Sequence, residues 1–334
     1  MAEAVAVPSF AGRAVLVTGA AGLVGSNLVR RLVADGAEVT VLLRDLDGGS
    51  PLAAIVADGR VRTVRGTLTD YADVERAVVE AEAEFCFHLG AQTLVPVASN
   101  IPLATFESNV MGTAHVLEAV RRHASLGTRV VVASSDKAYG SAEERPYVED
   151  LPLLGTQPYD ASKSAAEMVV RSYSRVYGVP VVTLRCANTY GPGDLNWSRL
   201  IPGALRAVLR GETLDIRSDG TPRRDYIHVD DVVSAYLCTA ARFDELGLAG
   251  EAFNAGTGIA TSVLELVAAI DAACQAEGAG ALRTRVLGTA RHEIPFQVLD
   301  ASKLRGRLGW APSVALSEGL RTTIPWYREA IPRG

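Results

Sequence analysis

Side chains that could carry acid–base chemistry are concentrated in one stretch of the chain, SSDKAYG at residues 134–140. The stretch follows the apolar run at 130–133, whose composition predicts a buried strand. Ser135, Asp136 and Lys137 should therefore emerge at the carboxyl end of that strand. In open α/β sheets this edge is where ligands bind. We expect a hydroxyl, a carboxylate and an ammonium group at the site of chemistry.

A tyrosine and a second lysine follow in the segment PYDASKSAAE. Tyr159 and Lys163 are four residues apart, which puts both side chains on one helical face. An ammonium group beside a phenol favours the phenolate and lowers the tyrosine pKa, so a weak acid becomes a usable base near neutrality. Such pairs are also common on exposed helices. This pair predicts chemistry because a strand-end hydroxyl and a glycine-rich loop precede it.

The glycine-rich loop lies near the amino terminus, where an apolar run ends in TGAAGLVGS. Gly19, Gly22 and Gly25 are three residues apart and precede an amphipathic segment at 23–34. Small residues let the backbone approach a pyrophosphate, and a helix amino terminus offers free N–H groups and the positive end of a dipole. A strand, glycines and a helix in this order predict dinucleotide binding.

The end of the next predicted strand bears on the choice of dinucleotide. It reads Leu43-Arg44-Asp45. An acidic side chain here would bind the adenine ribose hydroxyls and favour NAD, whereas an arginine would accommodate the 2′-phosphate of NADP. Both types occur side by side, so NADP stays possible. We expect NAD, because a cofactor that is recycled within one turnover need not be NADPH.

The elements that must position these groups alternate between strand and helix from residue 14 to residue 185. Short apolar runs predict strands, and longer amphipathic segments predict helices. We expect strands at 14–17, 38–43, 60–65, 85–89, 130–133 and 181–185, and long helices at 105–123 and 159–177. This alternation predicts an α/β fold with a Rossmann-type, doubly wound parallel sheet.

Composition narrows the class of protein. The chain of 334 residues is 48% hydrophobic and 21% charged with a formal net charge of −5, and it has no basic block, which argues against a nucleic-acid partner. No apolar run approaches the ~18 residues of a membrane helix, and residues 1–8 lack a basic region. We expect a cytoplasmic protein without membrane association. Its four scattered cysteines predict free thiols, with neither a disulfide framework nor a metal site.

Taken together, the strand-end hydroxyl, the Tyr-x-x-x-Lys pair and the Gly-x-x-Gly-x-x-Gly loop resemble the extended short-chain dehydrogenase/reductase family of NAD-dependent nucleotide-sugar epimerases and dehydratases. Later motifs follow the family's order: RCANTYGPGD, RRDYIHVDD, NAGTG, RHE, DASKL and LGWAP. The resemblance covers roughly residues 13–328. It implies an enzyme whose oxidoreductase triad is Ser135, Tyr159 and Lys163.

The resemblance also implies a set of cofactor contacts. Asn109 would brace the active-site strand, and Gly90 and Ala91 would let the cofactor pass close to the backbone. Two positions depart from the family pattern, since relatives usually carry acids where Leu43 and Thr67 stand. The implied cofactor-binding residues are Gly19, Gly22, Leu23, Val24, Gly25, Arg44, Asp45, Leu68, Leu89, Gly90, Ala91, Asn109, Tyr159 and Lys163.

For the substrate, the resemblance implies a nucleoside diphosphate sugar. Asn188 would hydrogen-bond the diphosphate, and Arg224 and Arg291 would supply positive charge. Asn196 and Trp197 would flank the base and ribose. The implied substrate-binding residues are Gln92, Asn188, Asn196, Trp197, Leu200, Ile201, Arg224 and Arg291.

The resemblance further divides the chain into two domains. Residues 1–188 with about 224–256 would form the dinucleotide-binding Rossmann domain, and residues 189–223 and 257–334 a smaller C-terminal α/β domain for the nucleotide sugar. In many relatives the two long helices pair into a four-helix bundle, so we expect a homodimer by analogy.

The pair after the catalytic hydroxyl suggests the reaction outcome. In the family, the tyrosine takes a proton from the sugar 4-hydroxyl while hydride leaves C4. A 4,6-dehydratase then needs a base for the C5 proton and an acid for the departing 6-hydroxyl. Ser135-Asp136-Lys137 and the segment HLGAQ most resemble the CDP-glucose 4,6-dehydratase branch. We therefore assign Asp136 as general acid and Lys137 as candidate base.

Other interpretations of these residues stay open. Asp136 and Lys137 could form only a structural ion pair beside the site. The same triad would also serve a nucleotide-sugar 4-epimerase, which needs only rotation of the keto sugar and hydride return to its other face. A non-catalytic nucleotide-binding protein is a third possibility, against which the intact triad argues.

Overall fold

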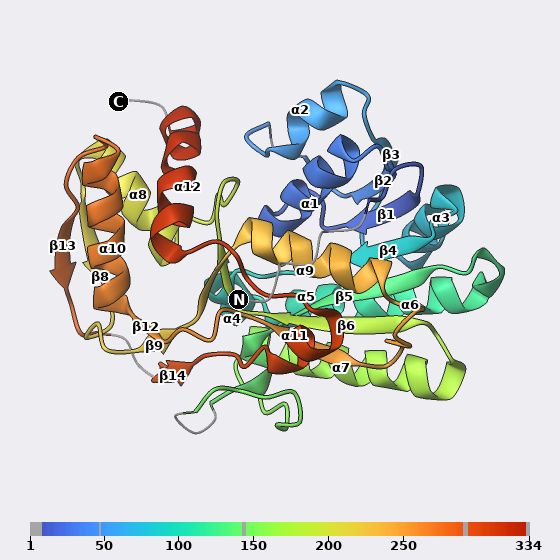
Figure 1. Ribbon diagram of the computed structural model, residues 1–334. Helices are drawn as coiled ribbons and strands as arrows, with labels where there is room; N and C mark the ends of the chain where they lie inside the picture. Colours follow the sequence, from blue (N-terminus) through green and yellow to red (C-terminus); the bar gives the residue numbers. More distant parts are fainter. Residues whose placement is uncertain (1–8, 47, 142–144, 290–292, 332–334) are drawn as a thin grey trace.

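The computed structural model describes residues 9–46, 48–141, 145–289 and 293–331 (Figure 1). Within this part of the chain, the largest sheet is parallel throughout and has the spatial order β11-β6-β5-β4-β1-β2-β3. Its strands are β1 (Ala14–Thr18), β2 (Glu38–Leu43), β3 (Arg62–Arg65), β4 (Phe85–His88), β5 (Arg129–Ser135), β6 (Val181–Cys186) and β11 (Ala252–Ala255). The predicted doubly wound Rossmann-type sheet is confirmed.

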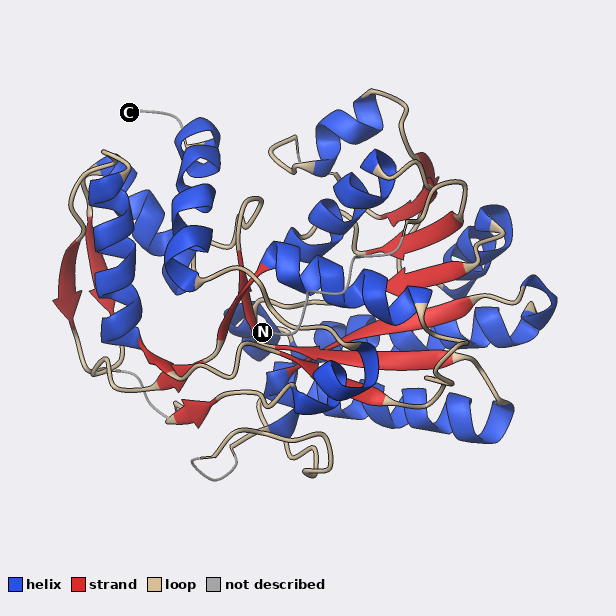
Figure 2. Ribbon diagram, viewed as in Figure 1, coloured by secondary structure: helices blue, strands red, loops and turns tan. Residues whose placement is uncertain are grey.

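Helices cover both faces of this sheet, as Figure 2 shows. Side chains alternate between the faces along each strand. Val15 and Val17 of β1 therefore pack with one set of helices, and Leu16 between them packs with the other. The first set is α1 (Leu23–Ala34), α2 (Leu52–Ala57), α9 (Val229–Ala241) and α11 (Ser302–Leu308), and the second is α3 (Tyr71–Ala81), α6 (Gly112–Arg122) and α7 (Pro158–Tyr177).

The predicted long helix at 105–123 is confirmed in extent, since residues 102–122 are helical without a break, but it is not α-helical throughout. After two short helices, α4 (Val95–Asn100) and α5 (Pro102–Phe106), the chain makes a π-helical turn at Glu107–Met111 before α6 begins. A π turn inserts an extra residue and redirects the side chains around it, which is frequent at functional sites. Here the turn carries Asn109, which is buried. Apolar periodicity gives no sign of such a turn.

A smaller group of elements lies beside the sheet (Figure 1). Its core is formed by Ile201, Leu205, Ile270, Leu320 and Tyr327. Three helices surround this core: α8 (Leu200–Arg210), α10 (Val263–Ala276) and α12 (Leu316–Ala330). Its short strands are β7 (Asn188–Tyr190), β8 (Thr213–Ile216), β9 (Arg223–Arg224), β10 (Tyr226–His228), β12 (Thr261–Ser262), β13 (Arg283–Val286) and β14 (Phe296–Gln297).

The next observations, on membrane helices, metal sites and cysteines, apply to the described residues alone. No helix among them has the length and apolar character that crossing a membrane requires. They also contain no group of three or more histidine, cysteine or acidic side chains arranged to hold a metal ion. The cysteines are free thiols as predicted: Cys86, Cys238 and Cys274 are buried, and Cys186 is partly exposed.

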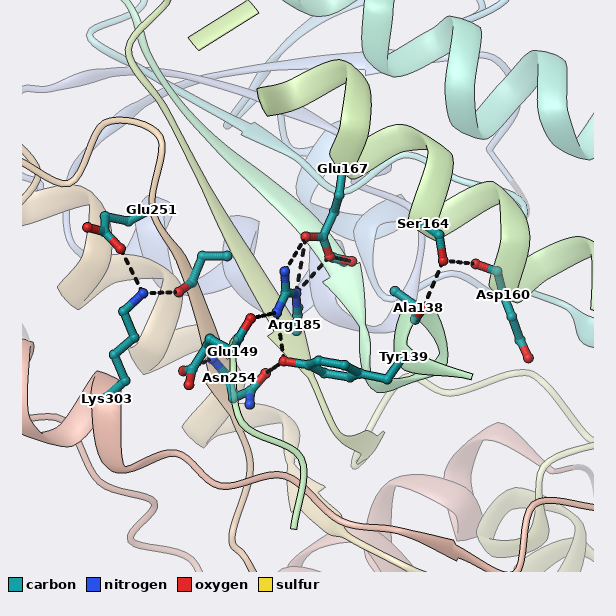
Figure 3. A network of polar contacts seen from close by, with 12 residues as sticks. Ala138, Tyr139, Glu149, Asp160, Ser164, Glu167, Arg185, Glu251, Asn254 and Lys303 are labelled. Carbon is teal, nitrogen blue, oxygen red and sulfur yellow. Dashed lines mark hydrogen bonds and ion pairs between the residues drawn. The ribbon is translucent and has the colours of Figure 1, made fainter. Parts of the chain in front are cut away.

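A buried ion pair joins β6 to α7 (Figure 3). The Arg185 side chain is fully buried, and its Nη2 and Nε atoms donate to the Glu167 carboxylate at 2.7 and 2.9 Å. Glu167 also accepts a 2.5 Å hydrogen bond from Ser134 of β5. Arg185 Nη1 donates to the Tyr139 hydroxyl, which donates in turn to Asn254 of β11. The network thus ties three strands and one helix together.

We expect loss of the Glu167 carboxylate to be strongly destabilising, because the Arg185 charge would stay buried without its partner. Breaking a buried pair in this way costs about 3–5 kcal/mol. Urea unfolding of Glu167→Gln should show a decrease of this size in the free energy of unfolding.

Two further variants identify the cause. The double variant Glu167→Leu with Arg185→Met should recover most of the lost stability, because it removes both charges together. Asp215→Asn, which breaks an exposed ion pair with Arg285, should leave the urea midpoint unchanged. A double variant no more stable than Glu167→Gln would contradict the charge explanation.

Candidate active site

The loop between β1 and α1 leaves no room for side chains at two of its glycines. Gly19 has φ +70°, and a Cβ there would lie 2.5 Å from the Gly90 nitrogen. A Cβ on Gly25 would overlap the Gly19 carbonyl oxygen. At Gly22, by contrast, a Cβ would meet only that oxygen, at 3.5 Å. Gly22 is also the N-cap of α1, and no side chain caps this end.

This arrangement fits a pyrophosphate. The first N–H groups of an α-helix have no partner within the helix. At α1 they belong to residues such as Leu23 and Val24, and they lie next to the open space at Gly22. A dinucleotide phosphate placed there would receive hydrogen bonds and the positive end of the helix dipole.

The end of β4 is held in place by a buried histidine. His88 Nδ1 lies 2.8 Å from Thr18 Oγ1, and His88 Nε2 lies 3.1 Å from Thr113 Oγ1. Burial, assisted by the nearby Lys163 charge, lowers the pKa of His88 to about 3, so the ring is neutral. Thr18 also accepts a hydrogen bond from the Gly90 nitrogen. Backbone hydrogen bonds to Thr18 thus hold two of the predicted cofactor neighbours, Leu89 and Gly90, and Ala91 follows them in the chain.

Asn109 braces the segment that follows β4. Its Oδ1 accepts a hydrogen bond from the Gln92 nitrogen at 2.6 Å, and its Nδ2 donates to the Gln92 carbonyl and to Ser162 Oγ of α7. Both amide hydrogens are therefore used within the protein. The structure supports the bracing role, while direct contact of Asn109 with a cofactor stays a prediction.

The end of β2 carries the two charged residues that could select the cofactor. Arg44 Nε donates to Asp45 Oδ2 at 2.7 Å, and both side chains are more than three-quarters exposed. Leu43 is buried, and the Thr67 hydroxyl contacts Thr69. Neither position that departs from the family pattern offers an acid. Leu68, another predicted cofactor neighbour, packs closely on Gly90. A Cβ added at Gly90 would lie 2.5 Å from Leu68 Cδ1.

The predicted catalytic hydroxyl and tyrosine lie together. Ser135 Oγ accepts from the Lys137 nitrogen at 3.2 Å and donates to Asp136 Oδ1 at 2.9 Å, so Ser135 caps the short 3₁₀ helix at Asp136–Tyr139. Tyr159 is buried in the first turn of α7. Burial raises the pKa of the Tyr159 phenol to about 12, and a hydrogen bond with Ser135 opposes this rise.

The prediction that the pKa of this phenol is lowered is wrong. A neighbouring ammonium was expected to lower the pKa of Tyr159, but the pKa is raised because burial outweighs the charges around the ring. Lys163 Nζ donates to the Ala133 carbonyl at 2.9 Å. Burial lowers the pKa of Lys163 itself to about 8, with Glu167 opposing the shift. Lys163 therefore keeps most of its positive charge near neutral pH.

The next two residues have the proton affinities that an acid and a base need. Asp136 is 2% exposed, and burial raises its pKa against the charges of Lys137 and Arg224. Burial also lowers the pKa of Lys137, against the attraction of Asp136. Lys137 Nζ donates to Gln297 Oε1 at 2.6 Å. A carboxyl whose pKa is raised and an amine whose pKa is lowered are thus adjacent.

Two predicted phosphate ligands lie beside this pair. Asn188 Nδ2 is 3.4 Å from Asp136 Oδ2 and 3.3 Å from the Asp225 carbonyl oxygen. Arg224 is largely buried, and its Nη2 lies 3.5 Å from Glu293 Oε1. The guanidinium is therefore balanced by a carboxylate within the protein. Arg291 lies outside the described residues.

The other predicted substrate residues pack mainly within the smaller group of elements. The Trp197 ring lies 5.9 Å from the Tyr327 ring, and Arg206 stacks over Trp197 at 5.6 Å. Asn196 Oδ1 accepts from Ser198. α8 begins at Leu200, and Ile201 is buried in its core. Gln92 Oε1 accepts from the Leu94 nitrogen at 2.9 Å. Contacts of these residues with a ligand stay predictions.

Sequence reasoning missed two polar residues at the site. Burial raises the pKa of Asp160 to about 6, and Lys137 opposes this rise. The sequence does contain a signal for Asp160. This residue follows Tyr159 at the start of a helix that is expected to lie beside the strand-end groups. Gln297 comes from β14, 160 residues away from Lys137 along the chain. Nothing in its local sequence indicates that contact.

The chain belongs to the NAD-dependent epimerase/dehydratase family, whose model matches residues 15–256. A UDP-glucose 4-epimerase of Mycolicibacterium smegmatis is 36% identical over 319 residues, which cover 94% of this chain and 98% of the relative. A dTDP-glucose 4,6-dehydratase of Streptomyces niveus is 35% identical over 325 residues, which cover 94% of this chain and 93% of the relative.

Solved structures agree with this assignment. The crystal structure of a dTDP-glucose 4,6-dehydratase from Streptomyces venezuelae with NAD bound is 32% identical, with a TM-score of 0.84, and the match covers 94% of this chain and 97% of that chain. The predicted class, an NAD-dependent enzyme among the nucleotide-sugar epimerases and dehydratases, is confirmed. NAD is the family's cofactor, and the α1 loop fits it.

We expect alanine at Gly22 and at Gly25 to have different effects. Gly22→Ala should fold normally but bind NAD about tenfold or more weakly, because its methyl group enters the space where the pyrophosphate approaches the backbone. Gly25→Ala should lower the melting temperature even without cofactor, since its Cβ meets the Gly19 carbonyl oxygen. Calorimetric titration with NAD and thermal unfolding measure the two effects. Wild-type NAD affinity in Gly22→Ala would contradict the assignment of this space.

Proposed function

We propose that this enzyme is a nucleoside diphosphate hexose 4,6-dehydratase. One observation carries the proposal: a buried carboxyl with a raised pKa, Asp136, and a half-buried amine with a lowered pKa, Lys137, directly follow the Ser135 hydroxyl. Elimination of water needs one group that gives a proton and another that takes one. The similarity to proteins named dTDP-glucose 4,6-dehydratase supports the same reaction.

In the first step, Ser135 and Tyr159 bind the sugar 4-hydroxyl, and Tyr159 takes its proton. Bound NAD supplies the hydride acceptor for C4 and later the hydride donor. The raised pKa of Tyr159 means that the phenolate must be favoured by a positive charge at the moment of transfer. Lys163, one helical turn away, is the lysine placed to supply that charge.

In the second step, the resulting 4-ketone makes the C5 proton acidic. The neutral Lys137 amine takes this proton while Asp136 gives its own to the departing 6-hydroxyl. Both groups need the protonation states that burial favours. Hydride return to C6 and proton return to C5 complete a 4-keto-6-deoxy sugar.

The substrate side of the proposal rests on the residues around Arg224. We propose that residues 1–188 with about 224–256 hold NAD, and that residues 189–223 and 257–334 hold the nucleotide. The pairing of β11 with β6 supports the return of the later segment to the large sheet. Asn188, Arg224 and Arg291 would bind the diphosphate, and Arg224 would then exchange its contact with Glu293 for phosphate oxygens.

A nucleotide-sugar 4-epimerase is the second candidate. It is favoured by the 36% identity to a UDP-glucose 4-epimerase. That reaction uses the same first step but needs neither Asp136 nor Lys137 as a proton-transfer group. The two functions therefore differ in whether the pair after Ser135 is required.

Incubation with CDP-, dTDP-, UDP- and GDP-linked hexoses, followed by mass spectrometry, tests the proposal. We expect one donor to lose the mass of one water. Asp136→Asn and Lys137→Met should each slow this loss on the order of 10²–10⁴-fold. The wild-type rate should show a bell-shaped pH dependence, because Lys137 must be unprotonated and Asp136 protonated.

The epimerase would be indicated by an unchanged mass with new C4 stereochemistry, and by epimerase activity that survives both substitutions. Tyr159→Phe serves as the control, since it should stop either reaction at the first step. Loss of water that persists in Lys137→Met at the wild-type rate would remove the role assigned to that lysine.

We further propose a homodimer formed by the surface of α5, the π turn and α7. Leu103, Met111 and Met168 are exposed by 71%, 50% and 58% in the single chain. Apolar side chains exposed in this way on neighbouring helices are typical of a protein interface. Met168→Glu should convert a dimer to monomers in light-scattering measurements, whereas Leu264→Glu on α10 should not. A wild-type monomer at micromolar concentration would contradict the proposal.

A further inference from the structure

We propose that Gln297 is a positioning residue for Lys137: it holds the amino group at the site with a neutral acceptor, so that the lysine can lose and regain a proton without losing its place. The inference rests on the proposed function of Lys137 as the base. It adds a residue from the smaller group of elements to the proton-transfer machinery.

The contact between the two side chains is short and rigidly supported. Gln297 is fully buried, and its Oε1 accepts a hydrogen bond from Lys137 Nζ at 2.6 Å. Its backbone lies in the β9–β14 ladder, where Gln297 pairs with Arg224 and its carbonyl accepts from the Asp225 nitrogen. The ladder therefore fixes the backbone from which the amide extends, and full burial restricts the side chain itself.

The unpaired amide nitrogen of Gln297 indicates that the contact of its oxygen, Oε1, is the reason for a glutamine at this position. Gln297 Nε2 is buried and has no hydrogen-bond partner among the described residues. An unpaired buried donor is unfavourable, and an apolar side chain of similar size would avoid it. The glutamine thus carries a cost that its Oε1 contact with Lys137 offsets.

A neutral acceptor suits a group that changes its protonation state. Both an ammonium and a neutral amine can donate to Oε1, so the hydrogen bond survives proton loss. A carboxylate at the same place would favour the ammonium and hold its proton. Glutamine fixes the position of the nitrogen without fixing its charge.

The charges around Lys137 make this neutrality important. Asp136 on the same short helix, Asp160 on α7 and Glu293 before β14 all favour the protonated lysine, while Arg224 on β9 and burial disfavour it. The balance lies on the side of a lowered pKa. One more carboxylate, in direct contact with Nζ, would reverse it.

The chain contains an internal comparison. Only three of its 33 lysine and arginine residues are lysines: Lys137, Lys163 and Lys303. Lys303 Nζ contacts the Glu251 carboxylate at 2.7 Å (Figure 3), which is the ordinary partner of a structural lysine. The two site lysines instead donate to uncharged oxygens, of Gln297 and of the Ala133 carbonyl.

Carbon-13 labelling at lysine Cε tests the inference in the full-length protein, because only three lysine signals arise. Lys303→Arg assigns one of them, and Lys137→Arg another. In the wild type, we expect the Lys137 signal to titrate at lower pH than that of Lys303. Gln297→Glu should raise the Lys137 midpoint by about one pH unit or more. Gln297→Met should lower it, because the ammonium loses its acceptor.

Kinetics provide the second readout. At neutral pH, Gln297→Glu should slow water loss about tenfold and move the acidic limb of the pH profile upward, as its higher Lys137 midpoint requires. Single-turnover formation of reduced nicotinamide should be unchanged, since the C4 step uses Ser135, Tyr159 and Lys163. Gln275→Glu, the same change on the exposed surface of α10, should leave the Lys137 midpoint unaltered.

The outcomes separate the two proposals. A Lys137 midpoint that moves in neither Gln297→Glu nor Gln297→Met would overturn the positioning role, whatever the enzyme's reaction. Midpoints that move in opposite directions support it. If they move while no donor loses water, the dehydratase proposal fails and the control of Lys137 by Gln297 stands.

Discussion

The ion pair between Arg185 and Glu167 is the interaction on which the geometry of the site depends. Glu167 lies one turn beyond Lys163 on α7, as Lys163 lies one turn beyond Tyr159, so the pair fixes the rotation of the helix that presents both groups. The same carboxylate holds Ser134, the neighbour of Ser135, at the end of β5. One buried contact therefore sets the distance between the strand-end hydroxyl and the helix-borne phenol. Because Arg185 donates to the Glu167 carboxylate through two nitrogen atoms, the pair restrains β6 and α7 in more than one direction.

Burial is the common cause of the unusual proton affinities at this sheet edge. It disfavours charge, so it raises the pKa of Asp136 and Tyr159 and lowers that of Lys137 and Lys163. For the proposed elimination these directions are useful, because they favour the protonated form of the acid and the neutral form of the amine. For Tyr159 the raised pKa is unfavourable, because it makes the phenolate harder to form. The proposed oxidation therefore depends on positive charge brought near the phenol, whereas the proposed elimination depends on an amine that is itself uncharged.

Much of this could be predicted from the sequence because it is local. The apolar run at 130–133 and the spacing of Tyr159 and Lys163 place five catalytic candidates at one edge of a parallel sheet, and the glycine spacing places the dinucleotide loop beside them. What could not be predicted depends on contacts between distant segments. The Gln297 contact, the packing of Trp197 on Tyr327 and the dominance of burial over charge at Tyr159 have no local signature. The π turn at Asn109 is local, but apolar periodicity does not distinguish it from an α-helix.

The two-residue strand β14 has a consequence for how such enzymes diverge. It lies outside the large sheet, yet it supplies the partner of a side chain at that sheet's edge. The groups proposed for hydride transfer belong entirely to β5 and α7, whereas the amine of the proposed base also contacts a residue of a peripheral strand pair. A single exchange in β14 can therefore alter the fate of the keto sugar while the oxidation machinery stays intact. Substitutions in such peripheral strands could therefore give new reaction outcomes on this scaffold. The residues proposed for oxidation would stay unchanged, so no intermediate variant would have to lose them.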